Sequence, residues 1–238
     1  MQFQQHHRPI AGAVATQGVD VRREFIRKTY IHLGLAILAF ASLSFLLYDT
    51  GVSMKMTVWV MQGQFNWLLV LALFMGASYI ADRWARSDVS QTMQYIGLGL
   101  YIVAEAFIFA PILLIAAVYS DASILPTSIT LTVFLFAGLT GTVFITKKDF
   151  SFLRGVLAVG GMVAMGMILC SILFGFQLGV VFAGAMILFA AAAILYQTSQ
   201  IMAHYRPTQH VSASLGLFAA VALMFYYILM FFLSMSRN

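Results

Sequence analysis

Charged residues are scarce in this sequence, and their scarcity decides its broad class. Only 9% of the residues are charged and 62% are hydrophobic, whereas about a quarter of the residues of a soluble domain are charged. The mean hydropathy of +0.93 agrees with this composition. These values exclude a soluble globular domain and predict an all-α integral membrane protein in contact with the lipid bilayer. The net charge of +5 does not indicate nucleic-acid binding, because the basic residues are scattered between apolar runs.

Cysteine and the common catalytic motifs are also missing. Cys170 is the only cysteine, so no disulfide can form within the chain. The sequence has no HExxH motif and no pair of aspartates inside an apolar run, which argues against a metalloprotease or an intramembrane aspartyl protease. His32, His204 and His210 fall at the expected ends of spans, where a solvated histidine is the simplest interpretation. We therefore expect neither an enzyme nor a bound cofactor.

Methionines gather in one segment that we expect outside the cytoplasm. Met54, Met56 and Met61 lie close to Trp59 and Trp67. Thioether sulfur is a ligand for a soft metal such as Cu(I), but no histidine or cysteine accompanies these methionines. Packing at the membrane interface, with tryptophan in the aromatic belt, explains the segment without a metal site.

The apolar runs predict seven membrane-spanning helices, since one helical span needs about 20 residues; the second run, at about residues 67–81, is short. No charged residue lies between Arg154 and Arg206, so two spans must share that stretch. The segment Gly175–Gly179 holds two glycines around a glutamine and predicts the turn between them; its GxxxG spacing is alternatively a helix-contact face. The first four predicted spans cover about residues 29–48, 67–81, 92–118 and 127–146. The fifth lies between Arg154 and this turn, and the sixth and seventh cover about residues 178–202 and 211–235.

The distribution of basic residues predicts the orientation. Eleven of the 13 lysines and arginines fall on one side of the seven spans, and only Lys55 and Arg237 fall on the other. By the positive-inside rule the amino terminus is cytoplasmic. Residues 1–28 have no sustained apolar period and read as a flexible basic cytoplasmic tail, which leaves residues 29–238 as a seven-helix transmembrane domain.

Glu105 is the one charged residue near the middle of a predicted span. An ionisable group at mid-bilayer costs at least about 2.5 kcal/mol, so it normally faces the inside of a helix bundle. Pro111 follows on the same helix and is expected to kink it. Other side chains predicted at a similar depth, and hence candidate hydrogen-bond partners, are Ser42, Ser44, Thr130, Thr132 and Tyr226.

Two interpretations of Glu105 remain open. A neutral carboxyl group that donates one hydrogen bond between helices would be purely structural. A carboxyl group beside a proline kink would alternatively relay protons or coordinate a cation.

Two segments, Thr146-Lys-Lys-Asp-Phe-Ser-Phe-Leu153 and Ile194-Leu-Tyr-Gln-Thr-Ser-Gln-Ile201, resemble the Bax inhibitor-1 family, and within it the bacterial YccA-like branch. The resemblance extends from about Lys28 to the end of the sequence. It implies a multi-pass protein of the bacterial inner membrane whose seventh helix is enclosed by the other six. It also implies one of two functions, either modulation of proteolysis by a membrane-anchored AAA protease or a cation leak, calcium being the ion discussed for this family.

The sequence departs from the family at its acidic site. Members argued to leak calcium carry one carboxylate late in the sixth helix and one in the seventh, and the first of these positions matches Gln197. No Asp or Glu follows Asp149 in the sequence. A calcium site requires several oxygen ligands with carboxylate charge among them. Glu105 is not expected to replace the pair, because it lies roughly 20 Å from the cytoplasmic end of its helix and Gln197 only about 8 Å.

These observations favour a non-enzymatic modulator of membrane-protein quality control over a calcium or proton pathway through Glu105. A protease that pulls substrates from the cytoplasmic side needs an unfolded handle, and by composition residues 1–18 qualify as one.

Overall fold

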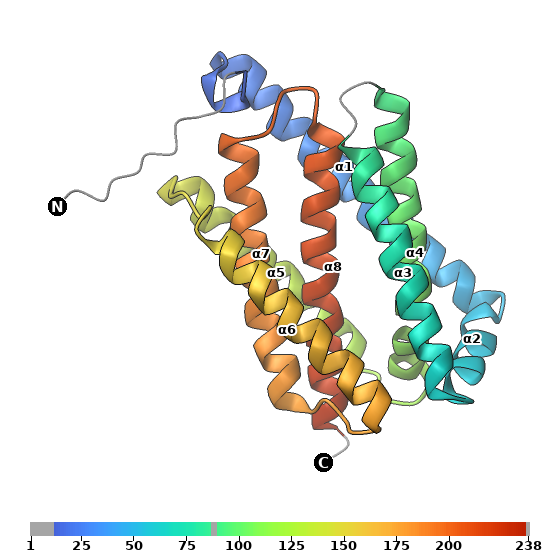
Figure 1. Ribbon diagram of the computed structural model, residues 1–238. Coiled ribbons are helices and arrows are strands. Elements are labelled where there is room, and N and C mark those ends of the chain that lie inside the picture. Colours follow the sequence, from blue (N-terminus) through green and yellow to red (C-terminus); the bar gives the residue numbers. More distant parts are fainter. Residues whose placement is uncertain (1–11, 87–89, 237–238) are drawn as a thin grey trace.

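The computed structural model describes residues 12–86 and 90–236, which form helices joined by turns and loops, without a strand among them (Figure 1). One short 3-10 turn precedes eight α-helices in the described part of the chain. The elements are η1 (Val14–Thr16), α1 (Val19–Asp49), α2 (Val52–Met61), α3 (Gln64–Ala85), α4 (Gln91–Val118), α5 (Ile124–Thr146), α6 (Leu153–Phe174), α7 (Val180–Ala203) and α8 (His210–Met235).

Seven of these helices are long and apolar enough to cross a membrane, by length and composition, within the described residues. The seven-span prediction is therefore confirmed. The turn between α6 and α7 is confirmed as well: Gly175 ends α6 with a φ of 71°, in the left-handed region that glycine adopts without strain. The short helix α2 was not predicted, because ten residues are too few for a span.

The helix that contains the first predicted span begins before residue 29. Helix α1 begins ten residues earlier, and Val14 in η1 is fully buried, with its N–H donating a hydrogen bond of 2.8 Å to the carbonyl of Tyr205. The early turns of α1 are amphipathic: Phe25 and Thr29 are buried, while Glu24 and Lys28 form an exposed ion pair of 2.8 Å. A search for long apolar runs misses such a helix. Of the predicted flexible tail, residues 1–11 lie outside the described residues.

Helix α8 is the centre of the bundle. Half of its most apolar 18-residue window is buried, against 44% for α4 and only 6% for α6. It packs against α1, α3, α4, α5 and α7 (Figure 1). The expectation that the other six spans enclose the seventh is confirmed for five of them, which explains how a helix without charge on any face is accommodated.

Helix α6 has a different position, since it lies across the bundle and packs mainly on α7 and α3 (Figure 1). Gly160 lies against the ring of Phe189, where an added Cβ would meet ring carbons at 3.0 Å. Small residues let helix backbones approach closely. Most of the remaining α6 surface is exposed in the isolated chain, as expected for a helix that faces lipid.

Candidate functional site

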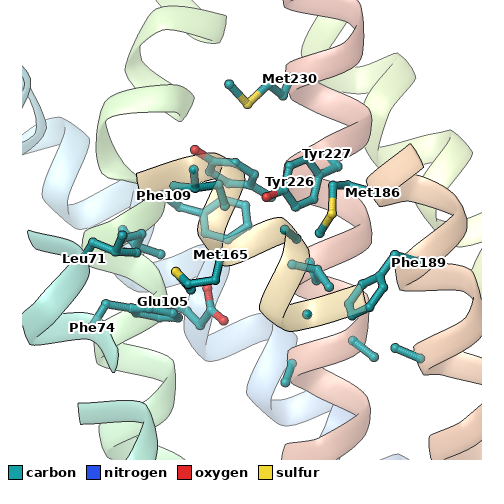
Figure 2. Close-up of a pocket in the computed structure, with 18 of the residues that line it drawn as sticks. Leu71, Phe74, Glu105, Phe109, Met165, Met186, Phe189, Tyr226, Tyr227 and Met230 are labelled. Atoms are coloured by element: carbon teal, nitrogen blue, oxygen red, sulfur yellow. The ribbon is translucent and has the colours of Figure 1, made fainter. Parts of the chain in front are cut away.

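A cavity of about 500 Å³ lies between α3, α4, α6, α7 and α8 (Figure 2). Aliphatic and aromatic side chains form most of its wall. Helix α8 supplies Tyr226 and Tyr227, α4 supplies Glu105, and small residues of α6 such as Gly161 and Ala164 leave room for the space. A cavity of this size can hold a drug-sized molecule.

Glu105 reaches this cavity from α4 and is only 5% exposed. Tyr101, one helical turn earlier, lies close enough for a side-chain hydrogen bond with the Glu105 carboxyl group. Among the lining residues Glu105 is the only acid, and no lysine, arginine or histidine lines the cavity. The prediction that Glu105 faces the inside of the bundle is therefore confirmed, and a tyrosine of its own helix is a polar neighbour.

Of the five predicted partners of Glu105, the structure brings only Tyr226 to the cavity. The Tyr226 ring packs edge-on against Phe109, with ring centroids 5.3 Å apart. Ser42 is exposed, and Ser44 does not line the cavity. The Thr130 and Thr132 hydroxyl groups donate to carbonyls of their own helix. These four predictions are wrong because depth along a helix does not decide which way a side chain points around it.

Pro111 is buried on α4, but it does not line the cavity. Helix α4 continues through it to Val118. Pro111 therefore belongs to the packing of α4 rather than to the cavity wall.

Gln197 lines the same cavity from α7, although it was predicted at a different depth from Glu105. Its side-chain amide lies over Gly216 of α8, where an added Cβ would stand 2.8 Å from the Gln197 Oε1 atom. Among its described lining residues, the cavity thus brings together the carboxyl group of Glu105 and the side-chain amide of Gln197.

Sequence reasoning missed several residues of the cavity. Tyr101 was detectable, since it precedes Glu105 by four residues and so shares its helix face. The contributions of Phe74, Met165 and Phe189 were not detectable, because they come from three other helices whose rotation about their axes the sequence leaves open (Figure 2).

A second cluster joins the α5–α6 loop to α7, and it unites the two segments that carry the family resemblance. The Phe150 N–H donates to Ser199 Oγ at 3.0 Å, and Gln200 Nε2 donates to Ser151 Oγ at 2.9 Å. The N–H of Ser151 donates to Asp149 at 2.8 Å. Although partial burial acts in the opposite direction, hydrogen bonds from Ser151 and Ser199 lower the pKa of Asp149. The network fixes the loop on α7.

Two of the histidines singled out in the sequence lie in contact, whereas the three methionines of α2 do not form a cluster. The rings of His32 and His210 meet with centroids 4.9 Å apart, a contact that the sequence did not indicate. On α2, Met56 packs against the core while Met54 and Met61 are exposed, so the three sulfurs do not converge. Among the described residues no group of three or more His, Cys, Asp or Glu side chains is placed to hold a metal ion.

Seven apolar helices long enough to cross a membrane, five of which line a cavity, define a polytopic membrane protein. Residues 22–238 match the family model described as Inhibitor of apoptosis-promoting Bax1. The chain belongs to this family, the Bax inhibitor-1 family.

Two relatives come from bacteria. The uncharacterized protein PA2604 of Pseudomonas aeruginosa is 34% identical over 113 residues, which cover 46% of this chain and half the length of that protein. The uncharacterized protein PM0402 of Pasteurella multocida is 25% identical over 202 residues, which cover 82% of this chain and 83% of that protein.

Proposed function

We propose that this protein is a non-enzymatic modulator of membrane-protein quality control that acts with a membrane-anchored AAA protease in the bacterial inner membrane. The observation that carries the proposal is the composition of the cavity. A calcium pathway requires several oxygen ligands with carboxylate charge among them. Glu105 is the only acid among the lining residues, and Gln197 presents an uncharged amide against Gly216. Within the family, this leaves the role in proteolysis as the better supported function.

The α5–α6 loop, which is held on α7, is a second feature that supports the proposed role in proteolysis. By the positive-inside rule Lys147, Lys148 and Arg154 lie on the cytoplasmic side. The hydrogen bond that Ser199 accepts from Phe150 and the one that Gln200 donates to Ser151 hold this segment on α7 in one conformation. A rigid, basic cytoplasmic surface suits recognition by a protein with a cytoplasmic domain, because less conformational freedom is lost on binding.

The test is the turnover of a known short-lived membrane substrate of the protease in cells that lack, contain or overproduce this protein. We expect overproduction to lengthen the substrate half-life, and we expect the protease to co-purify with the protein from mild detergent. Unchanged substrate half-lives at all three expression levels would refute the proposal.

The burial of Glu105 in a cavity supports a second candidate, a proton or cation pathway. Purified protein in liposomes distinguishes the two functions. A proton or calcium flux that Glu105→Gln abolishes, in the absence of any protease, would favour the pathway over the modulator.

A further inference from the structure

The cavity has a chemical composition that neither candidate function requires. Among the described residues that line it are one carboxyl group, no basic residue, and a wall of aromatic rings, methionines and aliphatic side chains. Ionisable groups inside a membrane protein are normally paired with a group of opposite charge. No basic side chain among the described lining residues can serve as the counter-ion of Glu105. A positively charged ligand would supply this counter-ion and stabilise the ionised carboxylate.

We propose that this cavity is a binding site for lipophilic cations, that is, molecules with an apolar body and a single amine, quaternary ammonium or phosphonium group that pairs with Glu105. The inference does not depend on the proposed role in proteolysis.

Aromatic rings lie on both sides of the acid. Tyr101 stands one helical turn from Glu105, and its ring packs near Phe74 of α3 with centroids 6.3 Å apart. On the other side Phe109 and Tyr226 form an edge-on pair with centroids 5.3 Å apart, and Tyr227 adjoins Tyr226 at 5.3 Å. Figure 2 shows Phe109 and the two tyrosines near Glu105 at the cavity. Ring faces attract a cation most strongly where water is excluded.

The remaining wall suits an apolar body of variable shape. Met165, Met186 and Met230 come from three different helices and line the cavity (Figure 2). Methionine is flexible and polarisable, so surfaces rich in it adapt to ligands of different outline. A volume of about 500 Å³ accommodates a body of two to four aromatic rings, the usual size of a drug-like ligand. The geometry therefore points to a class of cations rather than to one compound.

The test measures binding of tetraphenylphosphonium to the purified full-length protein by equilibrium dialysis, with empty detergent micelles as background. Triphenylphosphine oxide serves as a neutral probe with a similar aromatic body. We expect saturable binding of the cation to the wild type, and binding at least about tenfold weaker to Glu105→Gln, because the buried charge pair is lost. The control variant Asp121→Asn removes the same charge from an exposed loop residue and should bind like the wild type.

The pH dependence gives an independent measurement. If the cation pairs with ionised Glu105, it displaces a proton wherever the free protein holds Glu105 protonated, so the dissociation constant rises as the pH falls, by up to about tenfold per pH unit. The other titratable groups of the lining are Tyr101, Tyr226 and Tyr227, and Asp82 of α3 lies outside the lining. In Glu105→Gln the dependence should disappear, and the neutral probe should show none.

A second variant keeps the test decisive if Glu105→Gln folds poorly. Ala164→Phe fills part of the cavity from α6 and leaves the carboxyl group in place, so it should reduce cation binding. Absence of saturable cation binding to the wild type would overturn the proposal. Equal, pH-independent binding to the wild type and Glu105→Gln would also overturn it, as would equal competition by the neutral probe, since the cavity would then be a general apolar space.

Discussion

Glu105 is the residue at which a structural role and a functional role can be separated. Glutamine has the shape of a neutral glutamic acid and can still donate a hydrogen bond, so Glu105→Gln should keep the wild-type thermal stability and protease-modulating activity. Glu105→Leu should lose about 0.6 kcal/mol, the typical value of one interhelical hydrogen bond in a membrane. Thermal unfolding of the purified variants and substrate turnover in cells measure the two quantities. Loss of cellular function in a well-folded Glu105→Gln protein would transfer support to the ion pathway.

Asp149, which lies outside the spans, stabilises the α5–α6 loop in its ionised form. Its pKa is lowered from 3.8, so the stabilisation of the α5–α6 loop is fully present above that value and is lost as the pH falls through the lower folded pKa. At pH 7.5 the loop is therefore held on α7. We expect Asp149→Ala to be cut several-fold faster by trypsin at the exposed residues Lys147 and Lys148. Asp121→Ala, in the loop after α4, is the control and should not change this cleavage.

At the scale of elements, α3 and α4 approach each other closely at Gly97. An added Cβ there would lie 2.6 Å from the carbonyl oxygen of Ala81 and 2.8 Å from the amide nitrogen of Ala85, both backbone atoms. Gly97→Ala must push the two helices apart and should destabilise the bundle by about 1–3 kcal/mol. Gly99→Ala, two residues along the same helix, meets nothing within 4 Å and should be neutral or slightly stabilising. Equal unfolding midpoints for the two variants would contradict this close contact.

The elements also show what the sequence could predict and what it could not. The lengths of the apolar runs predicted the ends of α4 and α8 to within one residue, because a span must be long enough to cross the bilayer. The same criterion missed the start of α1, whose first turns alternate buried Phe25 with exposed charges. It also assigned Thr132 to Glu105 by depth alone, although that hydroxyl group bonds its own helix. Depth follows from composition, whereas rotation about a helix axis follows from packing between helices.

At the scale of the whole molecule, the cavity predicts the absence of a pH-gated calcium leak. Only one carboxyl group lines the cavity, so liposomes with wild-type protein should show no calcium flux with a carboxylate-type transition between about pH 6 and 8 that is independent of Glu105. Gln197→Asp should not create one in the Glu105→Gln background, since Gly216 opposite position 197 supplies no second carboxylate. A pH-gated calcium flux that persists in Glu105→Gln would contradict this prediction.

The amino-terminal segment supports a prediction about the lifetime of the protein. The Val14 N–H donates a hydrogen bond to the carbonyl of Tyr205, so the region available as a protease handle is shorter than the composition predicted. A deletion that tests the handle should therefore stop at residue 11. In cells that contain the protease, we expect removal of residues 2–11 to lengthen the lifetime of the protein, measured by pulse-chase, while thermal stability stays unchanged. An unchanged lifetime would exclude the handle.

The central position of α8 has a consequence for biosynthesis. Helices α1 to α7 are translated before α8, yet α8 contacts five of these helices and buries half of its most apolar window among them. Until it inserts, the polar side chains that the finished bundle hides, among them Thr29, Gln94 and Glu105, lack the core that α8 completes. A ribosome that stalls before residue 210 therefore leaves an open bundle in the membrane, with its inner surface accessible to lipid and to proteases.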